Sequence, residues 1–348
     1  MTVGEHAASP PPGLRPLPPC TAMTTEVAGW IPAAAPAAAC ARAVRRVFAR
    51  VEARLTRFRP ASELNRCCAA GGGRVSPVLF RALTTSARAW RRTGGLFDPR
   101  IRSALEGLGY DASLRFGPGG PARVARGRAP RPSSGGPWLT VAWSRGPALG
   151  RRRPHGLILQ PAAALDLGGI GKGLALRYAT AALRRCLGAG PGRPATFGPC
   201  GPSSPLRPGF LVDAGGDIWA EGAGPDGEGW PIAVAGPGGQ SAAHLRVAGR
   251  AVCTSSRGRR AWLAGGRAVH HLIDPRSGRP ADARLWSVTV IGRDPAWAEV
   301  WSKAIFIAGP GGARLAEARG IAALLVRPDG GAQATSACRR YLDGRPRS

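Results

Sequence analysis

Residues 165–173, with the sequence Leu-Asp-Leu-Gly-Gly-Ile-Gly-Lys-Gly, constrain this 348-residue chain more than any other segment. An apolar run at 157–159 precedes them and a periodic apolar stretch at 174–183 follows, which predicts a strand, a glycine turn and a helix. Glycines remove side chains where a ligand or another backbone must come close. The free N–H groups and positive dipole end of the helix favour an anion at the turn, most often a phosphate.

Two charged residues flank this turn. Asp166 could hold a metal or a ligand hydroxyl, and Lys172 could contact a phosphate. The glycine spacing matches neither G-x-G-x-x-G nor the Walker pattern, so the pattern alone leaves a purely structural turn open. Of the 49 basic residues in the chain, only Lys172 and Lys303 are lysines. Because a planar guanidinium cannot replace a compact ammonium, a lysine at this turn favours a functional role.

The formal net charge of +29 would ordinarily indicate nucleic acid, an anionic membrane or acidic substrates as partners. The arginines, however, are scattered and lack interleaved aromatic residues, so we expect no nucleic-acid site. Attraction of small polyanions, or compositional bias alone, explains the charge better. The eight cysteines have neither C-x-x-C spacing nor a Cys/His ligand pattern. They therefore predict no zinc site and no disulfide framework, which is typical of a reducing compartment.

The chain contains no apolar run near the ~20 residues that a membrane helix needs. Its proline-rich N-terminus has no basic region followed by an apolar core, so it is not predicted to be a secretory signal. We therefore expect no transmembrane segment and a cytoplasmic location, with peripheral membrane association or export left open.

Composition divides the chain into a central domain and two tails. Proline-rich residues 1–21 are predicted to be a disordered tail, and residues 336–348 a basic C-terminal tail. The domain between them, 22–335, contains two loop insertions rich in Arg, Pro and Gly, at about 115–155 and 188–209. Apolar spacing predicts helices at 36–55, 77–90, 174–183 and 297–309, and strands at 157–159, 210–220, 285–291 and 322–326.

Two polar segments have both a structural and a functional interpretation. Asp98 precedes a proline, so its backbone is expected to be extended, and it is either an N-cap or a ligand contact. Thr254 and Ser255 begin a run of three hydroxyl residues that ends a strand. Such a run either caps a turn or contacts a phosphate or a base.

Two further pairs of residues have spacings that indicate a chemical role. His271 lies three residues before Asp274, so the carboxylate could orient the imidazole as a general base. Glu299 and Lys303 lie four residues apart on a predicted helix, where an ordinary salt bridge is the structural alternative.

Taken in order, these motifs resemble the FAD:protein FMN transferases, the ApbE family, over about residues 22–330. The matching segments are 96–99, 165–173, 214–218, 254–256 and 271–280. The resemblance implies an α+β, two-lobed fold with mixed and antiparallel sheets flanked by helices. It also implies that the FMN moiety of FAD is transferred through a phosphoester to a threonine of an acceptor flavoprotein, that AMP is released, and that Mg²⁺ assists.

The same resemblance assigns site residues. His271 would be the base that activates the acceptor threonine, steered by Asp274, and Gly169 would offer its carbonyl region to the metal. Asp166 would bind FAD, or the metal at one remove. The other residues implied to contact FAD are Met23, Phe97, Asp98, Gly168, Lys172, Thr254 and Ser255.

The chain departs from the family at the predicted helix 297–309. Family members usually have an aspartate and, four residues on, a threonine there, both metal ligands; this chain has Glu299 and Lys303. Glutamate can ligate magnesium, but charged lysine has only donors. Two alternatives follow. The Lys303 ammonium replaces the cation opposite the pyrophosphate, or the chain is an FAD-binding protein or FAD pyrophosphatase with degenerate transferase activity.

Overall fold

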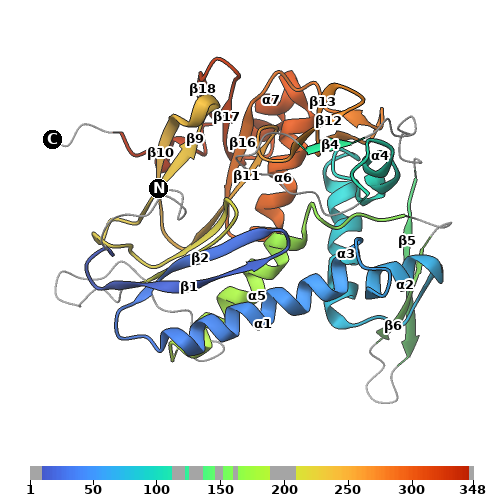
Figure 1. Ribbon diagram of the computed structural model, residues 1–348, viewed down its shortest axis with the longest axis horizontal. Helices are drawn as coiled ribbons and strands as arrows, with labels where there is room; N and C mark the ends of the chain where they lie inside the picture. Colours follow the sequence, from blue (N-terminus) through green and yellow to red (C-terminus); the bar gives the residue numbers. More distant parts are fainter. Residues whose placement is uncertain are drawn as a thin grey trace. The chain divides into compact units, whose positions relative to one another are not determined.

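The structure, a computed structural model, describes residues 10–111, 122–124, 136–145, 152–159, 164–188 and 209–344. The chain divides into two compact units (Figure 1). The first unit comprises 1–49, 172–258 and 282–348, and the second comprises 50–171 and 259–281. The chain passes from the second unit to the first at Lys172, within the glycine turn. Helices and sheets occur in both units, which confirms the α+β class.

An eight-stranded antiparallel sheet forms the centre of the first unit. Three of its strands are buried at every position, so both faces of the sheet are covered there. In order across the sheet, the strands are β1 (Leu14–Ala22), β2 (Thr25–Pro32), β7 (Phe210–Ala214), β8 (Asp217–Glu221), β11 (Arg250–Ser256), β16 (Ser287–Gly292), β17 (Ala322–Val326) and β18 (Ala332–Ala334).

The two faces of this sheet have different partners. Side chains alternate along a strand, and in β11 the residue Val252 joins the apolar cluster formed with Trp230 and Leu245 of a two-stranded hairpin. Its neighbour Cys253 instead contacts the backbone of Pro295 in a helix. The hairpin consists of β9 (Trp230–Ala235) and β10 (Ser241–Val247), and the helices of this unit include α5 (Gly171–Cys186), α6 (Pro295–Ile307) and α7 (Gly312–Ala318).

Local capping explains where α6 begins. Oδ1 of Asp294 accepts hydrogen bonds from the backbone N–H of Ala296 at 2.9 Å and of Trp297 at 3.2 Å, and Pro295 occupies the first turn. The helix therefore starts two residues before the predicted position. Most of its side chains are buried, among them Glu299. A charged residue is thus enclosed in the core of the first unit.

Both predicted tails were partly wrong. Residues 14–22 form β1, at the edge of the sheet, where prolines are tolerated because one side of the strand needs no hydrogen-bond donors. At the other end, Cys338 is fully buried and Leu342 forms an isolated bridge with Leu245. Residues 1–9 and 345–348 lie outside the described part.

The second unit combines helices with small sheets. The predicted second helix is confirmed, because Ser76 accepts from the N–H of Leu79 and Pro77 opens the first turn. The structure includes α1 (Ala37–Leu55), which reaches into both units, and α2 (Glu63–Ala69), α3 (Pro77–Arg92) and α4 (Arg102–Gly107), together with β3 (Gly72–Gly73), β4 (Ala122–Val124), β5 (Leu139–Arg145), β6 (Arg152–Leu159), β12 (Ala261–Ala264), β13 (Arg267–His270), β14 (Ile273–Asp274) and β15 (Arg279–Pro280).

The predicted insertion at 115–155 is partly structured. Strands β5 and β6 pair antiparallel across it, and β4 pairs parallel with β12, so the small sheets are mixed as well as antiparallel. The rest of that insertion, and residues 189–208 of the second one, lie outside the described part. Among the described residues, no helix combines the length and apolar character needed to cross a membrane.

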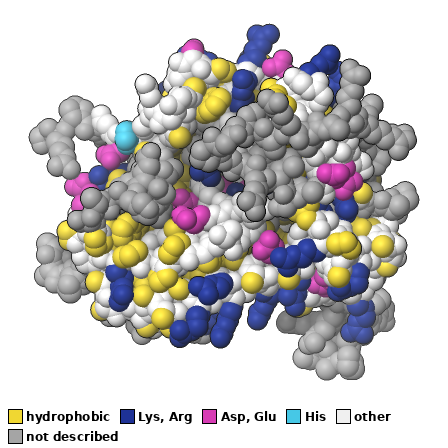
Figure 2. All heavy atoms as spheres, viewed as in Figure 1, with side chains coloured by type: hydrophobic (Ala, Val, Ile, Leu, Met, Phe, Trp, Pro, Cys, Tyr) yellow, Lys and Arg dark blue, Asp and Glu magenta, His cyan; other side chains and the backbone are white. Residues whose placement is uncertain are grey.

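On the face drawn in Figure 2, basic side chains are unevenly distributed. In the space-filling view, dark-blue side chains gather in the lower part, over α1, and elsewhere are interspersed with acidic ones (Figure 2). The exposed arginines of α1 include Arg42, Arg45 and Arg46. The absence of a nucleic-acid partner stays a prediction.

Candidate functional site

The glycine turn is held by Asp166. Its Oδ1 accepts from the N–H of Gly168 at 2.7 Å, and its Oδ2 pairs with Nε of Arg57 at 2.6 Å. The Arg57 side chain is buried and also donates to the carbonyl of Tyr110. Asp166 therefore has protein partners on both carboxylate oxygens, and its predicted contact with FAD or a metal stays a prediction. No sequence pattern pointed to Arg57, which lies 109 residues from Asp166.

One glycine of the motif is required for the approach of another backbone. A Cβ on Gly173 would lie 2.5 Å from the carbonyl oxygen of Pro295 and 2.6 Å from Cα of Ala296. The first turn of α5 thus packs directly on the first turn of α6. The backbone N–H of Gly173 also donates to Oε2 of Glu299 at 2.8 Å. Of the two roles that the sequence left open for the glycines, Gly173 has the structural one.

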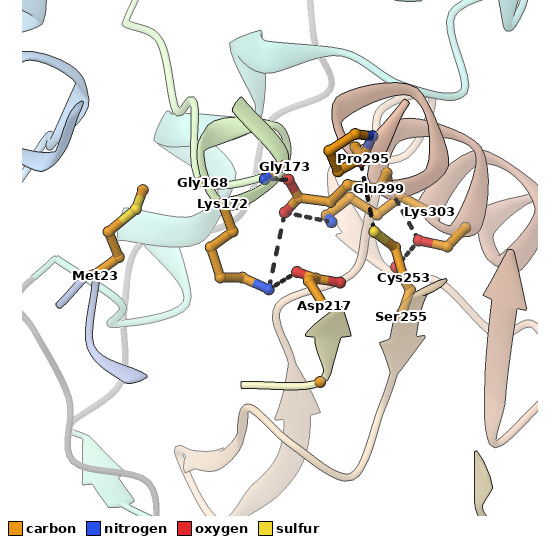
Figure 3. A network of polar contacts seen from close by, with 12 residues as sticks. Met23, Gly168, Lys172, Gly173, Asp217, Cys253, Ser255, Pro295, Glu299 and Lys303 are labelled. Atoms are coloured by element: carbon orange, nitrogen blue, oxygen red, sulfur yellow. Dashed lines mark hydrogen bonds and ion pairs between the residues drawn. The ribbon is translucent and has the colours of Figure 1, made fainter. Parts of the chain in front are cut away.

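The two lysines of the chain meet at one carboxylate (Figure 3). Nζ of Lys303 lies 3.3 Å, and Nζ of Lys172 lies 4.0 Å, from the same Oε1 of Glu299. Lys172 also pairs with Oδ2 of Asp217. We call Lys172, Asp217, Glu299 and Lys303 the lysine–carboxylate network. All four belong to the first unit.

Burial differs sharply within this network. The side chains of Asp217 and Glu299 are 1% and 0% exposed, whereas those of Lys172 and Lys303 are 14% and 16% exposed. Asp217 was part of a matched motif but was not selected as a site residue. The available signal was an aspartate at the start of a strand whose next three residues are apolar, because a buried carboxylate needs a charged partner.

The hydroxyl side chains at the end of β11 form hydrogen bonds within the protein. Oγ of Ser255 lies 2.8 Å from Oγ of Ser302, which itself donates to the carbonyl of Glu299. Thr254 and Thr289 join their hydroxyls at 2.9 Å. These bonds connect β11 to α6 and to β16. The hydroxyls thus have a structural role, and FAD contacts from Thr254 and Ser255 stay a prediction.

The thiol of Cys253 lies beside the network. It is fully buried and donates to the carbonyl of Pro295 at 3.5 Å. Burial, and then the negative charge of Glu299, raise the pKa of this thiol above its ordinary value. The group therefore stays neutral at physiological pH and does not offer a metal the thiolate that it would bind.

The residues present do not fit a magnesium ion. Both oxygens of Glu299 already accept from cationic or N–H donors, and Asp217 is paired with Lys172. The ammonium of Lys303 has donors only, where a metal needs acceptors. Within the described ranges, no group of three or more His, Cys, Asp or Glu side chains is arranged to hold a metal. The predicted metal contact of Gly169 stays a prediction.

The β1–β2 turn presents Met23 in an unusual backbone conformation. Met23 and Thr24 have φ values of 52° and 59°, a left-handed region that is costly for residues other than glycine. Such strain is concentrated at functional sites in proteins. Figure 3 draws Met23 apart from the dashed contacts of the network. Its predicted FAD contact stays a prediction.

In the second unit, the histidine segment has partners that differ from the prediction. Both carboxylate oxygens of Asp274 accept from Arg276, at 2.9 and 2.7 Å. Desolvation raises the pKa of Asp274, but the hydrogen bonds and charge of Arg276 outweigh it, so the pKa lies below its ordinary value. The prediction that Asp274 steers His271 was wrong, because Arg276 is nearer along the turn and occupies the carboxylate.

The two adjacent histidines have opposite tautomers. Nδ1 of His271 lies 3.3 Å from the carbonyl of Arg260, and a carbonyl only accepts, so this nitrogen carries the proton. Nδ1 of His270 instead accepts the N–H of Leu272 at 3.3 Å. Only His271 thus has its lone pair on Nε2, at the far side of the ring from the backbone.

Asp98 has the N-cap role that the sequence left as one alternative. It accepts from the backbone N–H of Arg100 at 2.9 Å and pairs with the Arg100 guanidinium at 2.7 Å. Phe97 beside it is buried. Asp98 also lines a cavity of about 470 Å³ in the second unit, so the segments 96–99 and 271–280 are brought together there. The cavity is lined by Trp90, Arg91, Gly94, Gly95, Asp98, Arg100, Pro275 and Arg276.

Comparison with known proteins gives one family. The model of the ApbE family matches residues 21–188 and 207–325. The FAD:protein FMN transferase of Escherichia coli (strain K12) is 30% identical over 125 residues, which are 35% of this chain and 36% of that protein. The FAD:protein FMN transferase of Rhodobacter capsulatus is 29% identical over 292 residues, 81% of this chain and 49% of that protein. The chain thus spans about a third to a half of these curated relatives.

Solved structures share the fold. The apo form of the Pseudomonas stutzeri flavinyl transferase ApbE superposes with a TM-score of 0.71 at 22% identity, covering 96% of this chain and 98% of that one. The ApbE protein of Thermotoga maritima superposes with a TM-score of 0.74 at 20% identity, covering 95% and 100%. Because the family model matches most of the 348 residues, this chain belongs to the ApbE family.

Proposed function

We propose that this chain transfers the FMN moiety of FAD to a threonine of an acceptor flavoprotein and releases AMP. The observation that carries the proposal is the pair of lysine ammoniums, held by buried carboxylates beside the first turn of α5. A helix N-terminus and two cations favour a pyrophosphate. The curated relatives named FAD:protein FMN transferases support FAD as the molecule that contains it.

The reaction exchanges one phosphorus–oxygen bond for another. The threonine oxygen forms a bond to the FMN-side phosphorus, the bond from that phosphorus to the bridging oxygen breaks, and AMP leaves with that oxygen. The hydroxyl proton passes to a base. Negative charge grows on the bridging oxygen as the bond breaks, so fixed cations lower the barrier by stabilising it. Lys172 is our choice for this role, with the positive end of the α5 dipole.

His271 is our choice for the base. Its tautomer leaves Nε2 as the acceptor, while the Arg260 carbonyl holds the ring through Nδ1. A base must accept the hydroxyl proton from within hydrogen-bond reach. His270 has the reverse tautomer, because its Nδ1 accepts the backbone N–H of Leu272, and it provides a matched control. The proton that His271 takes is later lost to solvent, which restores the neutral ring.

Magnesium, which the family resemblance implies, is not assigned a step. The carboxylates that would ligate it are occupied by Lys172, Lys303 and the N–H of Gly173. The mechanism therefore uses only groups of the chain. The acceptor threonine and the cytoplasmic location stay predictions.

The test is incubation of the chain with FAD and a threonine-containing acceptor domain. We expect AMP in the supernatant, measured by chromatography, and a flavin-fluorescent acceptor band on a denaturing gel. Free FMN and AMP without a labelled acceptor would instead indicate an FAD pyrophosphatase. Retention of FAD without AMP would indicate an FAD-binding protein, and neither AMP nor FAD retention would overturn the proposal.

A further inference from the structure

The lysine–carboxylate network presents cations, not carboxylates, to its accessible side. The side chains of Asp217 and Glu299 are only 1% and 0% exposed, whereas those of Lys172 and Lys303 are 14% and 16% exposed. A metal site requires accessible oxygen ligands. An anion site requires accessible donors, and here buried carboxylates hold the two ammoniums in place. The network has the second arrangement.

The geometry also brings the two ammoniums together. Both Nζ atoms contact the same Oε1 of Glu299, at 3.3 Å for Lys303 and 4.0 Å for Lys172. Like charges that meet at one buried carboxylate repel each other, and a further anion reduces that repulsion. The N–H of Gly173 occupies the other oxygen of Glu299, so this carboxylate cannot turn away from the lysines to meet a cation. A dianionic pyrophosphate matches the charge of two ammoniums held at one carboxylate oxygen.

We propose that Lys303 is a fixed cation that takes the place of a divalent metal, so that the chain binds the pyrophosphate of FAD through Lys172 and Lys303 without magnesium. This inference rests on the proposed function. The Lys303 ammonium provides the positive charge that faces the bound anion opposite Lys172. Because this charge belongs to a side chain, binding is metal-independent. A single ammonium supplies one positive charge where magnesium supplies two, so turnover is slower than a metal would allow.

The first experiment measures FAD affinity by flavin fluorescence titration, in excess EDTA and in Mg²⁺. The unaltered chain is expected to bind FAD equally in both. The variant Lys303→Met keeps the side-chain length and removes the charge, and we expect its dissociation constant in EDTA to rise about tenfold or more, as for loss of a hydrogen bond to a charged group. Arg314→Met, at an exposed position of α7, removes one positive charge as the matched control and should leave affinity unchanged.

Two results would overturn the inference. One is an affinity of the unaltered chain that falls about tenfold or more when EDTA replaces Mg²⁺. The other is a Lys303→Met variant that is folded by circular dichroism and binds FAD as the unaltered chain does.

The second experiment needs no variant. Lys172 and Lys303 are the only lysines in the chain, so reductive methylation followed by peptide mass spectrometry reports on these two side chains and the terminal amine. With FAD in EDTA, we expect both lysines to be protected and the terminal amine to react as before. Protection of Lys172 alone would overturn the role of Lys303 and leave the proposed function standing. No protection of either lysine would contradict the proposed FAD site itself.

Discussion

The backbone N–H of Gly173 donates to Oε2 of Glu299 at 2.8 Å, across 126 residues of chain. This bond fixes the carboxylate so that its other oxygen faces both lysines. It also joins the first turn of α5 to α6, where a side chain on Gly173 would not fit. One backbone bond thereby links helix packing to the charge arrangement of the candidate site.

Replacing Glu299 by glutamine should strongly destabilise the first unit. The amide oxygen can still accept from Gly173, but Lys172 and Lys303 lose a negative partner that is 0% exposed. Removing one partner of a buried ion pair costs about 3 kcal/mol. Urea denaturation followed by circular dichroism measures the loss. Asp226→Asn, which breaks an exposed ion pair with Arg246, is the control and should cost less than about 1 kcal/mol. Equal losses in both variants would contradict the buried network.

Gly173→Ala should destabilise the protein although alanine favours helices. The new Cβ would lie 2.5 Å from the carbonyl oxygen of Pro295, so α5 and α6 must separate. We expect a loss of about 1–3 kcal/mol, as for overpacked cores. Gly311→Ala is the control, because its Cβ would meet nothing within 4 Å. Thermal unfolding of the two variants gives the comparison, and a Gly173→Ala variant as stable as the parent would show that the helices do not touch there.

His271→Asn should lower turnover far more than His270→Asn. Of these two rings, only that of His271 has its lone pair on Nε2, so only its loss removes the proposed base. General-base catalysis contributes about 10²–10⁴-fold, and we expect a loss of turnover in that range. AMP release at saturating FAD measures turnover, and FAD affinity measured in parallel should not change. A larger loss of turnover in His270→Asn than in His271→Asn would contradict the assignment of the base to His271.

Stability should depend on the ionisation of Asp274 in acid. Its pKa is lowered in the folded chain by Arg276, although desolvation opposes this, so the pair stabilises the folded state only when the carboxylate is charged. That contribution is complete above the unfolded pKa of ~3.9 and is lost as the pH falls through the lower folded value. The difference in unfolding free energy between the parent and Asp274→Asn should therefore shrink below about pH 4. A difference that stays constant from pH 6 to pH 3 would contradict the pairing.

The sequence alone determined the features that depend on nearby residues. Caps such as Ser76 before Pro77 involve contacts within one turn, so α3 was predicted with a correct start. The strand, glycine turn and helix around 165–173 were predicted for the same reason, and the family resemblance gave the α+β class. The scarcity of lysine, in a chain otherwise supplied with arginine, already singled out Lys172 at the glycine turn.

Only the tertiary structure decided which groups face each other. Asp217 pairs with Lys172 from 45 residues away, and Arg57 holds Asp166 from 109 residues away. The tertiary structure also places the proline-rich β1 at a sheet edge. It pairs Asp274 with Arg276 instead of His271. No local pattern encodes these pairings, because buried charges take whichever opposite charge the packing of distant strands and helices brings within reach. Packing likewise set which side of the network is accessible, and therefore that ammoniums, not carboxylates, lie on that side.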